Sequence, residues 1–221
     1  MPVEALIFDL DGTLVDTAPD LMAATNYALS LVSRPPIAEK KFRHLVGHGA
    51  LQLIKSGLAE TGGAVSDSEV KRLYGEFLHF YSENISRHSN LFPGVIELLQ
   101  SAAARGLKIG VCTNKVELLS HKLLSELNIS DWFGAVVGGD TLPVMKPDPA
   151  PYKELARRLG VDPQHTLMVG DSETDIRTAQ NVGVPVIAVT FGYTAKPVES
   201  FSPTHVISHY DQAWPIILNY L

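Results

Sequence analysis

The sequence is poor in cysteine and has no long hydrophobic run. Its 221 residues include a single cysteine, Cys112, so no intramolecular disulfide can form and a cysteine-based metal site is excluded. No apolar run approaches the ~20 residues that span a bilayer. The N-terminus lacks the basic start, the apolar core and the cleavage site of a signal peptide. We therefore expect a cytoplasmic protein that does not enter a membrane.

The sequence also lacks an excess of positive charge. It has 18 Lys and Arg residues against 24 Asp and Glu residues, a net charge of −6 at pH 7, and no basic run. Such a chain is poorly suited to bind nucleic acid or a membrane surface, so we expect neither as a partner. Because a local pocket can still be positive, a small phosphorylated metabolite remains compatible with this composition.

The hydrophobic residues, 45% of the chain, form short runs that alternate with amphipathic helical patterns. Continuous apolar runs are typical of parallel strands that are buried on both faces. Such runs lie at residues 3–8, 107–112, 135–137, 166–169 and 184–189. Helical periodicity lies at residues 95–102, 116–127 and 172–182. The alternation predicts an α/β fold with a doubly wound, mostly parallel, Rossmann-like sheet.

One stretch, residues 16–86, breaks this alternation. It shows helical periodicity, which begins near Leu21, and no convincing strand. We therefore predict an all-helical domain at residues 16–86, inserted after the first strand. The α/β core domain would consist of residues 1–15 and 87–221.

Polar side chains follow four of the predicted strands. Ligands of an open parallel sheet bind beyond the carboxyl ends of its strands, so these side chains should converge at one edge. They are Asp9 and Asp11 after the first strand, Thr113 and Asn114 after the second, Lys146 in the loop after the third, and Asp171 and Asp175 after the fourth.

These residue types suit phosphoryl transfer. Clustered carboxylates repel one another and need compensation, and oxygen ligands suit a hard cation such as Mg²⁺. A lysine and a threonine hydroxyl would neutralise and hold phosphoryl oxygens. A carboxylate can also accept the phosphoryl group as an aspartyl-phosphate intermediate. The pattern therefore predicts a Mg²⁺-dependent site for a small phosphorylated substrate.

Each of these polar residues has a simpler explanation when it is taken alone. Asp, Thr and Asn commonly cap helices and turns, and Lys146 could be a solvated loop residue. We assign Asp16, Asp162 and Asp211 to such caps or to the surface. Capping explains poorly why the other polar residues follow four successive strands, and this coincidence favours a functional site.

The four motifs resemble those of the haloacid dehalogenase superfamily, in the same order and with plausible spacing. The matching strings are FDLDGTL at 8–14, TN at 113–114, KPDP at 146–149 and GDSETD at 170–175. The resemblance implies that Asp9 is the nucleophile and a metal ligand. It implies that Asp11 is first the general acid and then the base that activates water, while its carbonyl binds the metal. The founding dehalogenases lack the second aspartate, so Asp11 favours phosphate ester cleavage over carbon–halogen cleavage.

The same resemblance assigns the other matched positions. Thr113 and the Asn114 amide would bind the phosphoryl group, and Lys146 would neutralise Asp9 and the phosphoryl oxygens. Asp171 would complete the metal site, with Asp175 binding the ion directly or through water. The helical insertion would correspond to the cap that closes over the substrate in this family.

A finer resemblance links the sequence to bacterial phosphoglycolate phosphatases. It implies 2-phosphoglycolate as the substrate and glycines in the cap that let its backbone approach a small anion. The residues concerned are Gly47, His48 and Gly49, where His48 is either a substrate contact or a surface residue. The strings that carry the resemblance lie at 46–50, 138–142 and 146–151.

Other interpretations stay open at this point. Related members with such caps act on sugar phosphates or pyrophosphate, or are mutases like β-phosphoglucomutase. Receiver-type signalling modules also gather acidic residues, a phosphoaccepting aspartate, a threonine and a lysine on a parallel sheet. The place of Asp9 on the first strand, followed by Asp11, argues against a signalling module. Both a monomer and a homodimer are compatible with the sequence.

Overall fold

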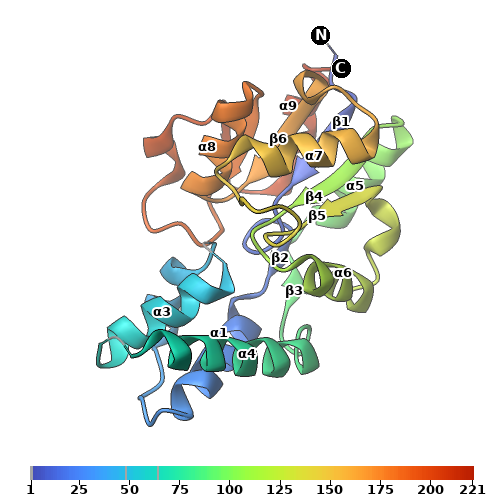
Figure 1. Ribbon diagram of the computed structural model, residues 1–221. Helices are drawn as coiled ribbons and strands as arrows, with labels where there is room; N and C mark the ends of the chain where they lie inside the picture. Colours follow the sequence, from blue (N-terminus) through green and yellow to red (C-terminus); the bar gives the residue numbers. More distant parts are fainter. Residues whose placement is uncertain (1, 48, 64) are drawn as a thin grey trace.

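The computed structural model describes residues 2–47, 49–63 and 65–221. Its main sheet has six strands in the order β5-β4-β1-β6-β7-β8, and every pairing is parallel (Figure 1). The strands are β1 (Ala5–Phe8), β4 (Lys108–Cys112), β5 (Ala135–Val137), β6 (Thr166–Gly170), β7 (Val186–Val189) and β8 (His205–Ile207). This topology confirms the predicted doubly wound α/β fold.

The five predicted apolar runs form β1, β4, β5, β6 and β7, whereas the edge strand β8 was not predicted. Strand β8 has three residues, of which only Ile207 is buried, so it carries no apolar run. The central strand β1 is buried on both faces. It sends Leu6 and Phe8 into one hydrophobic cluster and Ala5 and Ile7 into the other, as the two-residue period of a strand requires.

Helices cover both faces of this sheet. One face packs against α5 (Val95–Ala104), α6 (Glu117–Glu126) and α9 (Ala213–Leu218), and the other against α7 (Pro149–Leu159) and α8 (Glu173–Val182). The sequence patterns had not predicted α7. Short 3-10 helices connect the elements: η1 (Arg43–Leu45), η2 (Ser130–Trp132), η3 (Pro163–His165), η4 (Val198–Phe201) and η5 (Tyr210–Gln212). No helix in the described part of the chain is long and apolar enough to cross a membrane.

Four α-helices between β2 and β3 lie beyond one end of the sheet, at the bottom of Figure 1. They are α1 (Ala18–Ser30), α2 (Glu39–Phe42), α3 (Ala50–Thr61) and α4 (Asp67–Glu83). The chain leaves the sheet through β2 (Val15–Asp16) and returns through β3 (Asn90–Leu91). These two short strands pair antiparallel, so the outgoing and returning segments form one two-stranded connection.

Buried and half-buried polar groups fix this connection. The carboxylate of Asp20, at the start of α1, accepts hydrogen bonds from the backbone N–H groups of His88 and Ser89 and from Ser89 Oγ, at 2.7–3.1 Å. Asp16, which was predicted to be a cap or a surface group, has a side chain that is 30% exposed and makes two further contacts. Asp16 accepts a 2.6 Å hydrogen bond from Tyr193 Oη and pairs with Arg43 at 3.1 Å, so it ties the core to the inserted helices.

Candidate active site

The predicted site residues meet at the carboxyl ends of the three central strands. Asp9 follows β1, Thr113 follows β4 and Asp171 follows β6, and β1 lies between β4 and β6 in the sheet. Lys146 comes from the loop before α7, and Asp175 lies in the first turn of α8. All five side chains belong to buried residues. Parallel pairing brings them to one edge because it aligns the ends of strands that are far apart in sequence.

Lys146 provides the positive charge of this edge. Its ammonium lies 2.9 Å from Asp9 Oδ1 and 2.6 Å from Asp175 Oδ1, and only 1% of the side chain is exposed. Burial alone would lower the pKa of Lys146, but the charges of Asp175 and Asp9 outweigh it and raise the pKa. Lys146 therefore stays protonated and compensates the carboxylates around it.

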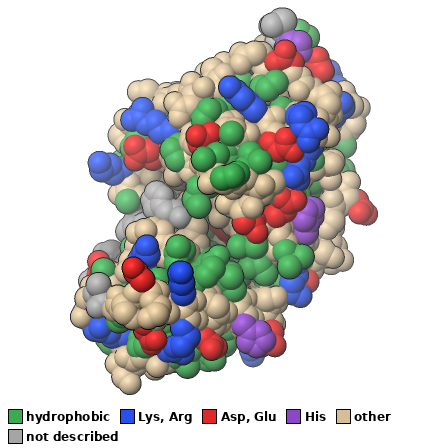
Figure 2. Space-filling model, viewed as in Figure 1, with side chains coloured by type: hydrophobic (Ala, Val, Ile, Leu, Met, Phe, Trp, Pro, Cys, Tyr) green, Lys and Arg blue, Asp and Glu red, His purple; other side chains and the backbone are tan. Residues whose placement is uncertain are grey.

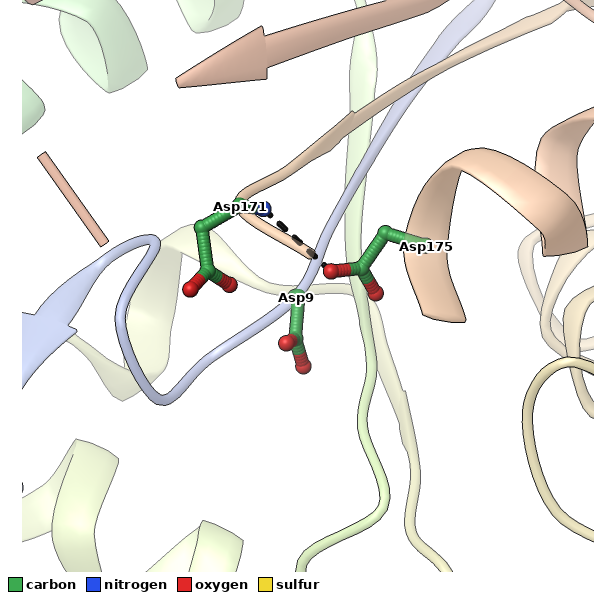
Figure 3. A group of neighbouring side chains, drawn as sticks. All are labelled: Asp9, Asp171 and Asp175. Atoms are coloured by element: carbon green, nitrogen blue, oxygen red, sulfur yellow. Dashed lines mark hydrogen bonds between the residues drawn. The ribbon is translucent and has the colours of Figure 1, made fainter. Parts of the chain in front are cut away.

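Three carboxylates lie side by side at this edge (Figure 3). Asp9, Asp171 and Asp175 each offer an oxygen, and these atoms lie within 4.8 Å of one another. Burial raises the pKa of Asp9 to about 7, against the opposing effect of Lys146. Burial, together with the charges of Asp175 and Asp9, also raises the pKa of Asp171. One lysine is thus not enough to keep all three groups ionised without cost.

This donor set fits a hard divalent cation. Asp9 Oδ1 is buried and accepts no hydrogen bond of good geometry, although Lys146 lies close to it. Asp171 is held in place by Thr13 Oγ1 at 3.1 Å and by the Tyr193 N–H at 2.7 Å. A buried cluster of oxygen ligands with an unsatisfied carboxylate oxygen is the environment that a divalent ion stabilises.

Both carboxylate oxygens of Asp175 are engaged by other groups of the protein. One of its oxygens accepts hydrogen bonds from the N–H groups of Asp171 and Ser172 and from Ser172 Oγ, while the other pairs with Lys146. Ser172 and Asp175 also form a capping box at the start of α8. Asp175 therefore orients both Lys146 and the turn that carries Asp171.

Two glycines leave room for this packing. A Cβ on Gly170 would lie 2.3 Å from the Cβ of Asp175. A Cβ on Gly12 would lie 2.5 Å from Asp171 Oδ2, and Gly12 has a φ of +84°, a conformation that favours glycine. The glycines in both motifs are thus required by close approach to the carboxylates.

The Asp11 carboxylate is bound by groups outside the three-carboxylate cluster. Its Oδ1 accepts a 2.7 Å hydrogen bond from Thr17 Oγ1. The ammonium of Lys115 lies 2.9 and 3.1 Å from its two oxygens and also donates to Tyr81 Oη at 2.7 Å. In this arrangement the Asp11 carboxylate is held between the connection to the inserted helices and a lysine that follows β4.

The loop after β4 joins the core to the inserted helices. Thr113 Oγ1 accepts a 3.2 Å hydrogen bond from the Lys115 N–H. The Asn114 side chain donates to the carbonyl of Lys146 at 3.1 Å and to the carbonyl of Gly47 at 3.2 Å. The side-chain amide of Asn114 is thus engaged in linking three segments of the chain.

A cavity of about 40 Å³ lies between the sheet edge and the inserted helices. Asp9, Asp11 and Thr113 line it from the core, and Gly47 and Gly49 line it from the insertion. The apolar part of its wall comes from side chains of both parts of the chain: Leu21, Val46, Leu53, Phe77, Leu78, Val116 and Leu119. Figure 2 shows hydrophobic side chains gathered across the middle of the molecule on this side. His48, the third predicted contact of the insertion, lies outside the described residues.

Comparison with known proteins identifies the family. Residues 6–189 match the family described as haloacid dehalogenase-like hydrolase. The chain belongs to this family. A phosphoglycolate phosphatase of Mesorhizobium japonicum is 43% identical over 206 residues, which cover 93% of this chain and 91% of the relative. A phosphoglycolate phosphatase of Caulobacter vibrioides is 41% identical over 202 residues, covering 91% and 85% of the two chains.

Solved structures agree with this assignment. The crystal structure of a predicted phosphoglycolate phosphatase from Haemophilus somnus 129pt matches with a TM-score of 0.90 and 32% identity, and the match covers 97% of each chain. The comparisons confirm the predicted family and the predicted enzyme class. The haloacid dehalogenase-like chain described here is a phosphoric monoester hydrolase.

Lys115, Tyr81 and Tyr193 are among the site residues that were not predicted from the sequence. Lys115 follows the Thr113-Asn114 motif directly, and this adjacency was a usable signal. Tyr81, from α4, and Tyr193, from the loop after β7, gave no signal because their partners lie far away in sequence. Tyr193 binds Asp171 through its N–H and Asp16 through its hydroxyl, so it connects the carboxylate cluster to the linker strand β2.

Proposed function

We propose that this hydrolase is a Mg²⁺-dependent phosphatase that hydrolyses 2-phosphoglycolate through an aspartyl-phosphate on Asp9. The single observation that carries the chemistry is the placement of Asp9 beside Lys146 and within the three-carboxylate cluster. The substrate is supported by the relatives named phosphoglycolate phosphatase, which match more than nine-tenths of this chain.

The proposed reaction has two steps. A carboxylate oxygen of Asp9 attacks phosphorus, the ester P–O bond breaks, and Asp11 gives a proton to the leaving oxygen. Asp11 then takes a proton from water, which attacks the aspartyl-phosphate, releases inorganic phosphate and restores Asp9. The Thr113 hydroxyl and the Asn114 amide hold the phosphoryl oxygens in both steps, and Lys146 neutralises the charge of Asp9 and of the phosphoryl group.

Asp9, Asp171 and Asp175 would hold the metal, with the Asp11 carbonyl as a further ligand and Asp175 binding directly or through water. The ion supplies charge neutralisation for the phosphoryl group when it is bound. Mg²⁺ suits this set because it prefers a few carboxylates together with water and substrate phosphate.

We further propose that residues 16–86 form a cap domain over a core of residues 1–15 and 87–221. The two-stranded connection of β2 and β3 supports this division, since the chain crosses between the two parts only there. Gly47 and Gly49 would meet the substrate from the cap, where the cavity is lined by both parts. Closure of the cap would exclude water until the aspartyl-phosphate has formed.

Phosphate release from a panel of phosphorylated metabolites, measured with Mg²⁺ and with EDTA, tests this proposal. We expect the highest kcat/KM for 2-phosphoglycolate and no turnover in EDTA. A higher kcat/KM for a sugar phosphate or pyrophosphate would overturn the substrate. Conversion of a sugar 1-phosphate to its 6-phosphate without free phosphate would instead identify a mutase.

The cellular setting is also a proposal. The single cysteine, Cys112, is buried, and burial raises its pKa to about 12, so it is an unreactive thiol that suits a reducing cytoplasm. We propose a cytoplasmic enzyme that acts as a monomer or a homodimer. Sedimentation of the purified protein distinguishes these two states.

A further inference from the structure

Lys115 occupies an unusual position in the cavity. Its side chain is 5% exposed, and its ammonium contacts both oxygens of Asp11 and the hydroxyl of Tyr81. The ammonium also lies 4.5 Å from the centre of the Tyr81 ring. These contacts use all three of its N–H donors, so Lys115 is fully paired in this structure.

Lys115 is also the single cationic residue among the described residues that line the cavity. Lys146 pairs with Asp9 and Asp175 and is not among the residues that line the cavity. The remaining charges in the wall are the carboxylates of Asp9 and Asp11. A substrate that carries a second negative group besides its phosphate therefore finds one cationic partner for that group in the described wall, the ammonium of Lys115.

We propose that Lys115 releases the carboxylate of Asp11 when substrate binds and pairs with the carboxylate of the substrate instead. This inference rests on the proposed function, because it assumes a phosphate ester that carries a carboxylate one methylene away from the ester oxygen. In the free enzyme Lys115 holds Asp11; in the complex it holds the substrate, and Asp11 turns to the leaving oxygen. Lys115 is thus both a specificity residue and the residue that positions Asp11.

The surroundings of Lys115 favour replacement of Asp11 by a substrate carboxylate over a release of Asp11 that leaves the ammonium unpaired. An ammonium left without a partner in a cavity lined by apolar side chains such as Leu21, Phe77 and Leu119 would carry a large desolvation cost. A substrate carboxylate replaces the lost partner, whereas a methyl group in the same place cannot. Tyr81 keeps its contact throughout and fixes the ammonium at the cavity wall.

Two matched substrates test the exchange. Ethyl phosphate has a methyl group where 2-phosphoglycolate has its carboxylate, so the ratio of their kcat/KM values measures recognition of the carboxylate. In Lys115→Met we expect this ratio to fall by roughly 30-fold or more relative to the wild type. The kcat/KM for ethyl phosphate should fall by a much smaller factor than that for 2-phosphoglycolate, because ethyl phosphate offers Lys115 no carboxylate. Lys115→Arg should restore part of the ratio.

A merely structural role for Lys115 predicts a different result. Both kcat/KM values would then fall by the same factor in Lys115→Met, and the unchanged ratio would overturn the inference while the proposed function stands. If the wild type turns over neither substrate, or both equally well, the proposed function itself fails. Lys122→Met is the matched control, since Lys122 lies on α6 and pairs with Glu126 at 2.6 Å on the surface.

A second variant covers the case in which Lys115→Met does not fold. Tyr81→Phe removes one hydroxyl from the ammonium and keeps the aromatic ring. We expect a smaller fall in the same ratio. In the Asp9→Asn background, which prevents turnover, a calorimetric titration should show that Tyr81→Phe weakens the binding of 2-phosphoglycolate. An unchanged ratio in Tyr81→Phe, together with unchanged binding, would overturn the placement of the carboxylate.

Discussion

The cavity has one wall at the sheet edge and one formed by the inserted helices. The two differ in charge and in the contacts that fix their side chains. At the sheet edge, Asp9 lines the cavity and pairs with the buried Lys146, which in turn pairs with Asp175, at 2.6–2.9 Å. Facing them, the helices contribute apolar side chains such as Leu21, Leu53 and Phe77. The first wall can carry charge because strand ends and helix starts supply hydrogen-bond donors; the second can exclude water.

Few polar contacts join the two walls. Asn114 reaches the carbonyl of Gly47, and Lys115 reaches the hydroxyl of Tyr81. We therefore expect the buried carboxylates and Lys146 to carry out the chemistry, the helices to exclude water, and Lys115 to recognise the substrate. Substitutions among the carboxylates and at Lys146 should change turnover, whereas substitutions at Lys115 or in the helices should change specificity or stability.

The largest effect is expected at the centre of the sheet edge. Asp9→Asn removes the nucleophile, so kcat should fall by ~10⁴-fold or more, while metal and substrate still bind. Steady-state phosphate release and calorimetric binding measure the two parts. The control is Asp162→Asn, which alters an exposed cap of η3 and should leave kcat unchanged. A tenth of wild-type turnover in Asp9→Asn would exclude Asp9 as the essential nucleophile.

A smaller loss is expected when the charge of the sheet edge is removed. Lys146→Met leaves Asp9 and Asp175 without their shared cation, so kcat should fall by ~10²–10³-fold. The variant should also be less stable than the wild type at neutral pH, by ~3 kcal/mol in urea unfolding. Lys153→Met, an exposed change on α7, serves as the control. A wild-type kcat in Lys146→Met would contradict the expectation that the charge of Lys146 at the sheet edge is needed for turnover.

Next in size is the pH dependence of the metal-free protein. Asp9 has a pKa of about 7 in the folded state against an ordinary value of 3.8, so folding takes up a proton between these values. The free energy of unfolding should therefore fall as pH rises from about 4 to about 7, by roughly 4 kcal/mol at most from this group. Asp171 acts in the same direction.

Thermal unfolding in EDTA measures this dependence. Because a divalent cation favours the ionised carboxylates, added Mg²⁺ should raise Tm more at pH 8 than at pH 5. In EDTA, Asp9→Asn should show a flatter profile than the wild type. A stability that rises between pH 4 and pH 7 in the metal-free wild type, or an equal Mg²⁺ effect at both pH values, would contradict the raised pKa.

The smallest effect is expected at Asp20, beside the two-stranded connection of β2 and β3. Asp20→Asn puts an amide where the backbone N–H groups of His88 and Ser89 require an acceptor, and this should cost ~1–3 kcal/mol in urea unfolding. The exposed Asp67→Asn on α4 is the control and should change stability by less than about 1 kcal/mol. Equal stability of the two variants would show that Asp20 does not hold the connection.

Much of the sheet edge could be predicted because its information is local. The apolar runs predicted β1, β4, β5, β6 and β7, and the polar residues that follow them converge as parallel topology requires. The edge strand β8 was missed because half-exposed residues leave no apolar run, and the linker strands β2 and β3 were missed because each has two residues. The roles of the individual site residues stay predictions.

The sequence by itself determined the family, the positions along the chain of the strands that carry the motifs, and the residue types at the sheet edge, since all three depend on short local patterns. Only the tertiary structure decided which charges are paired. Asp11 meets Lys115 across 104 positions of the chain, and Lys115 meets Tyr81 from an inserted helix. Such pairings follow from how the helices pack over the sheet, and no local pattern encodes the distance between two side chains that folding brings together.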